Sequence, residues 1–411
     1  MAAHEMESPD SPTRPGRWRQ LAGISLAHLV ADGYASFPMP LLSTLALTFG
    51  VEYRSVSILI GLGTASLALA NVVVGLGSDR WKHLRRATII VSAAVCAICM
   101  SAIGVAGGYW VLAAVMMAGM FGCGAFHPPG FSVAGEICRP HRQRGVSIAM
   151  AAGVAACGLG PVFVSQVVGN FGLRATVWCV IPGLVIVAAA GLLLRGRSSE
   201  GVTNDDPLPS DATAPAAKRK VWFSLLFANT VLREIARVGV AVIVSFLVEK
   251  KWGLSVATSG LGIGALFVGA GLGGILGAYV TRTGHERRTL LWCSPFSVLI
   301  LIPMALTVGT AWFLWLFLFG LTVAAPAPVV VGMAQRIAPR RSALVSGFLI
   351  GPAGAIAALL ASATTPLLVK EHGQAVTMAF LAIPLVLSWL IAWFLPRADK
   401  TRAGGADATL A

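Results

Sequence analysis

Long apolar stretches alternate with short polar segments along nearly the whole chain. Twelve such stretches occur, and each is at least 20 residues long, which is the length that a helix needs to cross the apolar core of a bilayer. They cover residues 21–49, 56–78, 87–106, 109–137, 146–169, 175–194, 221–248, 256–280, 289–308, 312–333, 343–369 and 375–395. The pattern predicts an all-α membrane protein with twelve transmembrane helices.

The composition supports this prediction and excludes other classes of protein. Hydrophobic residues make up 56% of the 411 residues, charged residues make up 12%, and the mean hydropathy is +0.79. A soluble globular domain does not have this composition. The chain also contains no zinc-ligand set, no Ser/His/Asp arrangement at compatible depth and no nucleotide-binding loop. We therefore expect no enzyme activity, no cofactor and no bound metal.

The distribution of basic residues indicates how the chain lies in the membrane. If the N-terminus is cytoplasmic, the inner segments hold 24 of the 31 lysines and arginines and the outer loops hold five. This asymmetry follows the positive-inside rule, so we expect both termini to be cytoplasmic. It also accounts for the net charge of +14 without a nucleic-acid partner. The remaining two basic residues, Arg233 and Arg237, lie inside an apolar stretch.

The chain divides into two halves of similar pattern. Gly277–Arg288 resembles Gly75–Arg86 at a separation of 202 residues, and Pro328–Arg341 resembles Pro129–Arg142. A polar stretch rich in Pro, Asp and Ser separates the halves. The expected organisation is a cytoplasmic tail (1–18), an N-terminal six-helix half (19–195), a cytoplasmic linker (196–220), a C-terminal six-helix half (221–396) and a second tail (397–411). Parallel halves of this kind place a binding site between them, near the middle of the membrane.

The first apolar stretch contains a histidine and a carboxylate. His28 and Asp32 are four residues apart, so they share one face of a helix. An ionised group in the bilayer centre costs about 2.5–3.5 kcal/mol, so this face must look into protein or a water-filled cavity. Asp32, together with His28, is therefore a candidate proton carrier, and the alternative is a static hydrogen-bonded pair that only holds helices together.

Two further stretches contain ionisable residues. In the fourth, His127 precedes Pro128 and Pro129, which predicts an interrupted helix with His127 beside a cavity, or else a structural histidine. In the seventh, Glu234 can pair with Arg237, and Arg233 remains. This group is either an anion site or a structural salt bridge between the halves.

The segment after the second stretch carries a family resemblance. Gly75-x-x-x-Asp79-Arg80, followed by basic residues, resembles the signature loop of the major facilitator superfamily, although Gly77 and Lys82 depart from its usual pattern. In that superfamily the acid stabilises the outward-open arrangement, so the resemblance implies a conformational switch at Gly75, Asp79 and Arg80. The alternative is that the basic residues of this loop only mark the cytoplasmic side of the membrane, as they do in every inner loop. The superfamily lines its cavity with helices 1, 4, 7 and 10, and the deep ionisable residues here lie on stretches 1, 4 and 7.

Three motifs together narrow the resemblance. His28-x-x-x-Asp32, Phe126-His127-Pro128 and Gly160-Pro161 are similar to the fosmidomycin-resistance type of exporter in that superfamily. This type often has an acid where Pro129 stands, so a proton relay at that position is not implied. The resemblance implies a proton-coupled antiporter for drug efflux and resistance in the inner membrane of a bacterial cell, and we expect a monomer.

The sequence thus predicts a proton-coupled secondary transporter that exports a small organic anion or drug by alternating access. Protons would be carried by Asp32 and His28. The substrate-binding candidates are Arg233, Glu234, Arg237, His127 and Tyr34, with Trp222 and Phe126 as further aromatic contacts. Protonation of Asp32 leaves the arginines less compensated, which by itself favours an organic-anion importer. A non-transporting receptor or scaffold on the same fold is a further alternative.

Overall fold

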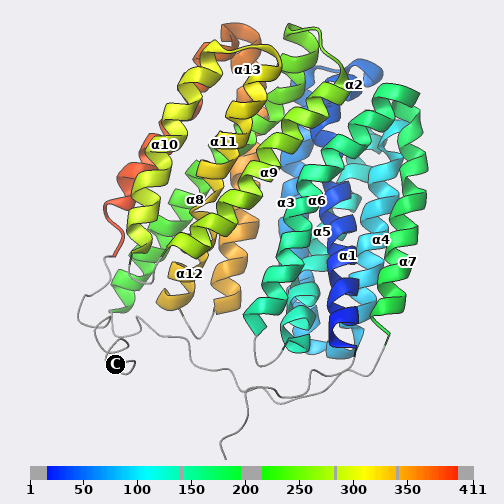
Figure 1. Cartoon of the computed structure of the whole chain (residues 1–411), viewed down its shortest axis with the longest axis vertical. Coiled ribbons are helices and arrows are strands. Elements are labelled where there is room, and N and C mark those ends of the chain that lie inside the picture. Colours follow the sequence, from blue (N-terminus) through cyan, green and yellow to red (C-terminus); the bar gives the residue numbers. More distant parts are fainter. Residues whose placement is uncertain (1–15, 139–141, 196–214, 282–284, 339–341, 397–411) are drawn as a thin grey trace, which may run out of the picture.

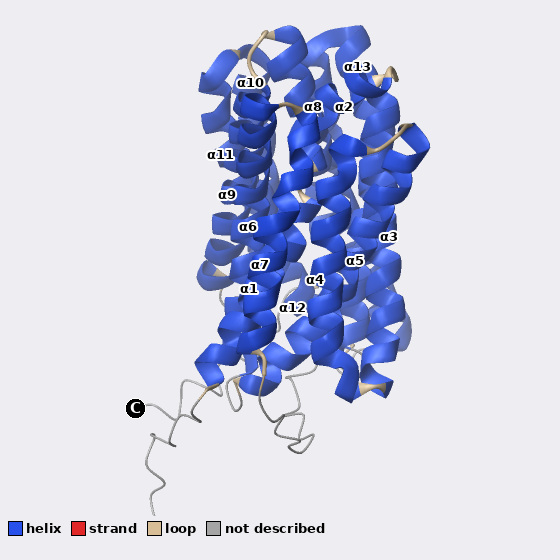
Figure 2. Cartoon of the chain, turned by 90° about the vertical axis from the view of Figure 1, so that its right-hand side faces the viewer, coloured by secondary structure: helices blue, strands red, loops and turns tan. Residues whose placement is uncertain are grey.

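Helices form the whole of the secondary structure in the part of the chain that the computed structural model describes (Figure 2). These residues are 16–138, 142–195, 215–281, 285–338 and 342–396. The N-terminal half contains α1 (Arg17–Ala35), α2 (Pro38–Phe49), α3 (Tyr53–Arg80), η1 (Lys82–Leu84), α4 (Arg85–Ser101), η2 (Ala102–Val105), α5 (Tyr109–Ile137), α6 (Arg142–Phe171), η3 (Leu173–Cys179) and α7 (Val180–Leu193). The C-terminal half contains α8 (Ala216–Ser245), the π-helical η4 (Phe246–Lys251), α9 (Val256–Val280), α10 (Glu286–Leu306), η5 (Gly309–Ala311), α11 (Trp312–Ala324), α12 (Ala327–Ile337) and α13 (Ser342–Ala392).

The helices form two bundles side by side, one from each half of the chain (Figure 1). We call the end of the molecule at which α1 begins and α13 ends the terminal end, and the opposite end the distal end. Turns at the distal end use glycines with positive φ, such as Gly50 at 62° and Gly373 at 79°. Other residues rarely adopt this conformation, so glycine allows the chain to reverse there.

The helices are consistent with twelve membrane crossings. Among the described residues, nine helices are long and apolar enough to cross a membrane. One of them, α13, contains two crossings because its backbone leaves the helical conformation at Gly373. The first crossing, made by α1 and α2, and the seventh, α8, are not among the nine. These two contain most of the ionisable residues that the sequence analysis placed deep in a helix, and His127 lies on α5, which is among the nine.

Two predicted helices are broken by proline. The first apolar stretch divides into α1 and α2 at Ser36 and Phe37, and the tenth divides into α11 and α12 at Ala325 and Pro326. Proline has no N–H and cannot donate to the preceding turn. Pro38 begins α2, and Ser36 Oγ donates to Gly33 O at 2.6 Å just before the break.

The predicted interruption of the fourth helix is wrong. α5 continues from Tyr109 to Ile137 through both Pro128 and Pro129. Two prolines remove two backbone donors, but α5 packs against α3 and α4 and its Phe126 is fully buried. These neighbours hold the helical path although its internal hydrogen bonding is incomplete.

Large apolar side chains cover much of the outer surface. Trp110 is 81% exposed, Leu76 72% and Phe394 73%. In water such a surface would drive association, whereas in a bilayer these side chains face lipid. The exposed apolar surface therefore agrees with a protein that is embedded in the membrane.

The most extensive contacts between the halves are those of α3 with α13 and of α6 with α9. Small residues allow close approach: a Cβ on Gly61 would lie 2.7 Å from Leu359 Cα, and a Cβ on Gly158 would lie 2.9 Å from Val268 Cγ2. Helices pack this closely in membranes when glycine or alanine lies at the contact. Gly158 of the fifth apolar stretch thus forms part of the contact between the halves, whereas Gly153 and Gly160 face α1 of their own half.

An ion pair occurs at equivalent places in the two halves, with the charges exchanged. Arg85 at the start of α4 lies 2.6 Å from Glu136 near the end of α5, and Glu286 at the start of α10 lies 2.7 Å from Arg336 near the end of α12. The repeated placement supports the internal repetition seen in the sequence.

Helix α8 begins at Ala216, inside the expected linker. The rest of that linker, residues 196–214, lies outside the described residues. The same is true of residues 1–15 and 397–411, which belong to the two expected tails.

Candidate functional site

Three ionisable side chains meet inside the N-terminal half. Asp32 of α1 lies between two histidines: its Oδ2 is 3.0 Å from His28 Nε2, and its Oδ1 is 3.2 Å from Nε2 of His127 on α5. The i,i+4 spacing in α1 and the continuous path of α5 bring them together. We call His28, Asp32 and His127 the proton cluster. The sequence analysis selected all three residues, but it did not predict that His127 would contact Asp32.

The hydrogen bonding of His28 places a proton in this cluster. His28 Nδ1 is 2.6 Å from Ala149 O, and because a carbonyl oxygen only accepts, Nδ1 must donate. In a neutral ring, Nε2 would then hold a lone pair 3.0 Å from a carboxylate oxygen. That contact is repulsive unless one proton lies on Nε2 or on Asp32. The 3.0 Å separation therefore suits a state in which the His28–Asp32 pair holds one proton.

Aromatic rings and a glycine enclose the cluster. The ring of Phe126 stacks on His28 at 4.8 Å between centroids, and Phe131 contacts it edge-on at 5.5 Å. On α6, Gly153 faces the pair so closely that an added Cβ would overlap both the His28 ring and the Asp32 carboxylate. Rings and backbone thus hold His28 in one orientation, and Phe126 supports the histidine, whereas the sequence analysis considered it a substrate contact.

Two cysteines complete the surroundings of Asp32. Cys123 Sγ lies 3.4 Å from Oδ1 and Cys157 Sγ lies 4.0 Å from Oδ2. The donor atoms of His28, Asp32 and His127 all lie within 4.8 Å of one another, so these side chains could also hold a metal ion. The sequence analysis did not identify this set, because its members lie on two helices 95 residues apart. All seven cysteines are free, and Cys96 Sγ donates to Ala31 O at 3.2 Å.

The second group of charges lies on α8 in the C-terminal half. Arg237 Nη2 pairs with Glu234 Oε2 at 2.5 Å, as the spacing predicts, and the guanidinium lies over the Phe267 ring at 5.8 Å. Arg233 is only 2% exposed. Its Nε donates to Asn229 Oδ1 at 3.2 Å and its Nη1 donates to Val323 O at 3.0 Å. Arg233 is thus bound to neutral oxygens inside its own half.

The two groups approach each other across the boundary between the halves. Cys157 lies within electrostatic range of both Asp32 and Arg237. The side chains of Asp32, His127, Glu234 and Arg237 keep 17%, 20%, 19% and 22% exposure. A water-sized molecule can therefore reach each of them. Cys157 is thus near one member of each pair, and the structure places Arg233 deeper in the C-terminal half.

Other residues selected from the sequence lie elsewhere. Tyr34 is 6% exposed, donates to Cys179 O at 2.5 Å and stacks on Phe37. Trp222 packs beside a separate apolar cluster near the terminal end of α8. Gly75 and Arg80 lie in the last turns of α3, and the side chain of Asp79 is outside the described part of the structure.

Sequence reasoning missed Ala149, Gly153, Phe131, Cys123 and Cys157. Only Gly153 had a signal, because it is one of several glycines in the fifth apolar stretch, and glycine allows helices to pack closely in membranes. The others are ordinary residues of apolar helices. Their role depends on which neighbours they meet in the folded chain.

Polar contacts between the halves gather at the distal end of the described structure. Tyr53 of α3 donates to Val242 O and lies 3.0 Å from Ser245 Oγ, both on α8. Thr44 of α2 donates to Glu249 Oε2 at 3.3 Å. Two more contacts join Arg54 Nε to Ala363 O at 3.0 Å and Lys370 Nζ to Glu52 Oε1 at 3.8 Å. We call this set of residues the distal clasp.

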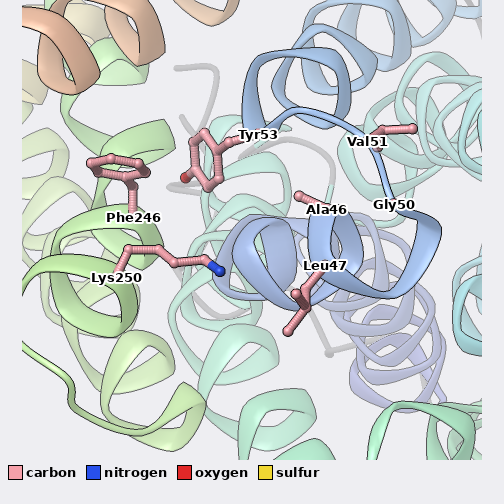
Figure 3. A pocket seen from close by; sticks show the side chains of 7 residues that line it. All are labelled: Ala46, Leu47, Gly50, Val51, Tyr53, Phe246 and Lys250. Carbon is pink, nitrogen blue, oxygen red and sulfur yellow. The ribbon is translucent and has the colours of Figure 1, made fainter.

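A small apolar pocket lies within the clasp (Figure 3). Its volume is about 250 Å³. In Figure 3 Tyr53 and Phe246 lie on one side of it, and Lys250 extends between them and the end of α2. The lining residues are Ala46, Leu47, Gly50, Val51, Tyr53, Phe246 and Lys250. None of them belongs to the proton cluster, so this pocket is separate from the site around Asp32.

The comparisons with known proteins agree with this architecture. The family model described as Major Facilitator Superfamily matches residues 24–348. The chain therefore belongs to the major facilitator superfamily, and it is a membrane transporter, not an enzyme. Among curated protein sequences, none matches it significantly.

Solved structures share the fold at low sequence identity. One is a bacterial homologue of the human lysosomal transporter Spinster in an inward-facing and occupied conformation, with 15% identity, a TM-score of 0.70, and coverage of 93% of this chain and 97% of that chain. The inward-facing and unoccupied conformation of such a homologue has 14% identity and a TM-score of 0.67, with 95% and 100% coverage. At this identity the likeness shows the fold alone. The more specific resemblance to fosmidomycin-resistance exporters rests on the sequence motifs.

Proposed function

We propose that this protein is a proton-coupled transporter that exports a small organic anion by alternating access of the two halves. Asp32 and His28 bind and release the proton, and His127 holds the second carboxylate oxygen. The observation that supports this role best is the contact of His28 Nε2 with Asp32 Oδ2 at 3.0 Å while Nδ1 donates to Ala149 O. A proton on His28 Nε2 or on Asp32 makes this contact favourable, and loss of that proton makes it repulsive.

The charges near the boundary favour an anionic substrate. Arg237 and Glu234 neutralise each other, and the guanidinium of Arg233 remains inside the same half without a carboxylate partner in the described structure. When the His28–Asp32 pair holds its proton, it adds no net negative charge. We assign direct substrate contact to Arg237, Glu234 and His127. Arg233 lies deeper in the C-terminal half and makes the electrostatic potential at the substrate site more positive without touching the substrate.

The switch between the two open states is proposed to use both ends of the molecule. The distal clasp joins the halves in this structure. At the terminal end, Gly75, Asp79 and Arg80 remain the proposed conformational switch, on the basis of the superfamily signature that they resemble. With cytoplasmic termini, as the positive-inside rule indicates, the clasp closes the outer side.

Transport in proteoliposomes tests the proposal. The purified protein is reconstituted with an internal pH-sensitive dye, and an imposed pH gradient drives a phosphonate probe such as fosmidomycin. An exporter of the proposed kind moves the probe uphill against the proton flow. Asp32→Asn should abolish this coupling, while Glu371→Gln, a change of an exposed carboxylate at the distal end, should preserve it. Wild-type coupling in Asp32→Asn would refute the role of Asp32.

The same assay decides direction and coupling ion. Proton binding makes the site more attractive to an anion, and this effect favours symport. If the probe and protons move in the same direction, the protein is an importer and the proposed export is wrong. A metal chelator in both compartments separates the two uses of the cluster. Coupling that persists with the chelator belongs to protons, and coupling that disappears belongs to a metal ion.

A further inference from the structure

Glu249 belongs to the distal clasp, but the proposed function gives its carboxyl group no part in proton binding. It lies in η4, one residue beyond the expected end of the seventh apolar stretch, and it is half-buried. Its Oε2 accepts from Thr44 of the N-terminal half at 3.3 Å, and its Oε1 accepts from Ser259 of α9 at 2.9 Å. The carboxyl group therefore connects three segments and both halves.

The partners of Glu249 are hydroxyl groups, which suit either protonation state. A hydroxyl can donate to a carboxylate, and it can also accept from a neutral carboxyl group. If the partner were an arginine instead of a hydroxyl group, the contact would require Glu249 to be charged. Contact between the halves at Glu249 can thus persist when the group takes up a proton.

Few charges surround this carboxyl group. Helix α2 contains no ionisable residue, and the only one on α9 is Tyr279 near its other end. On α8 the nearest is Arg237, twelve residues away. Lys250 and Lys251 follow on the same segment, and Tyr53 faces it from α3. Lys250 acts on Glu249 electrostatically, but burial has the larger effect and raises the pKa of Glu249 to about 7.

We propose that Glu249 is a second proton-binding group of this transporter, which takes up a proton when the distal end closes and releases it when that end opens. The inference rests on the proposed function only in requiring that the halves alternate. When the distal end opens, Thr44 separates from η4 and water reaches the carboxyl group.

The sign follows from linkage. The closed state holds Glu249 with a pKa of about 7, and exposure to water returns the pKa toward the ordinary 4.5. Protons favour the state that binds them more tightly, so acid stabilises the closed distal end. As pH rises from about 4.5 to about 7, the equilibrium shifts toward opening by up to about 100-fold, and above pH 7 this contribution no longer changes.

Distance measurements across the distal end test this proposal. Spin labels are placed on unnatural amino acids at Val105 and Val308, which are exposed on opposite halves, so that the native cysteines stay unmodified. The full-length protein in lipid nanodiscs is measured between pH 4.5 and pH 8.5. We use an Asp32→Asn background, which removes the carboxylate of the proton cluster, and we take the contribution of Glu249 as the difference from Glu249→Gln in the same background, since His28 and His127 are present in both. The long-distance population should increase up to pH 7.

Variants of the clasp give the decisive results. Glu249→Gln is permanently neutral, so its distances should stay at the acid values at every pH. Thr44→Val removes a donor that favours the charged form, so the pH window should move upward. Glu371→Gln, at the same end, should respond like the background protein.

If Glu249→Gln and Thr44→Val both follow the background protein, the proposal is overturned. Thr44→Val decides the matter alone if Glu249→Gln does not fold. The outcome is independent of the role of Asp32. If Asp32→Asn retains coupled transport, the proposed function is refuted, and the response of the distal distance to pH still decides on Glu249.

Discussion

The two halves bury ionisable groups in different ways. The proton cluster of the N-terminal half combines one carboxylate with two imidazoles, all of which can change protonation near neutral pH or when buried. The group on α8 contains two guanidiniums, which stay charged. One half can therefore exchange protons, while the other offers permanent positive charge. A transporter that couples protons to anions needs both properties, and among the groups in the two clusters each property belongs to one bundle, whereas the proposed proton site at Glu249 lies apart from both clusters at the distal end.

The strongest test of this division is Asp32→Asn. Asparagine keeps the shape but cannot bind the proton, so proton-driven transport should fall by about 100-fold or more, as is typical when a proton-transfer group is removed. Uphill accumulation in proteoliposomes measures it. Exchange of substrate without a pH gradient should decline far less, and an equal loss of both would show that Asp32 is needed for folding or for substrate binding.

Next in size is Arg237→Gln. A charged hydrogen bond is worth about 1.5–3 kcal/mol, so the KM for an anionic probe should rise by about 10- to 100-fold. The matched control is Arg174→Gln, at an exposed arginine, which should leave KM unchanged. Because the change also removes the partner of Glu234, the double variant with Glu234→Gln is measured in parallel. An unchanged KM in both variants would remove Arg237 from the substrate site.

Gly153→Ala tests the packing behind the proton cluster. The new methyl group would overlap His28 and Asp32, and such overpacking costs about 1–3 kcal/mol. We expect transport to fall by about 10-fold, with a changed pH profile, because the His28–Asp32 contact must shift. Gly274→Ala makes the same substitution where no atom lies within 4 Å, and its transport should match that of the wild type. Equal behaviour of the two variants would contradict the close contact.

The smallest effect is expected for Tyr34→Phe. The variant loses the hydrogen bond to Cys179 O, which contributes about 1 kcal/mol to stability. Thermal unfolding in detergent should show a slightly lower Tm, and transport should not change. A large rise in KM with unchanged Tm would instead return Tyr34 to the substrate site, where the sequence analysis had placed it.

The candidate site was predictable in part. The spacing of His28 and Asp32 predicted their contact, and that of Glu234 and Arg237 predicted their ion pair; both pairs are local within one helix. The contact of His127 with Asp32 was not predictable, because it joins α1 to α5. The continuous path of α5 through two prolines was also missed, since neighbouring helices maintain it. Neighbouring helices also decide why Arg233 and Arg237 have different surroundings although they lie one turn apart on α8.

The sequence alone determined that the chain is a helical membrane protein with two similar halves, because the bilayer imposes length and polarity on each segment separately. It also identified which helices contain ionisable groups, since such groups are rare in an apolar background. Only the tertiary structure decided that His127 contacts Asp32, which of these groups water can reach, and that Glu249 joins the halves. Those properties depend on contacts between helices distant in the chain, and no periodicity within one helix encodes them.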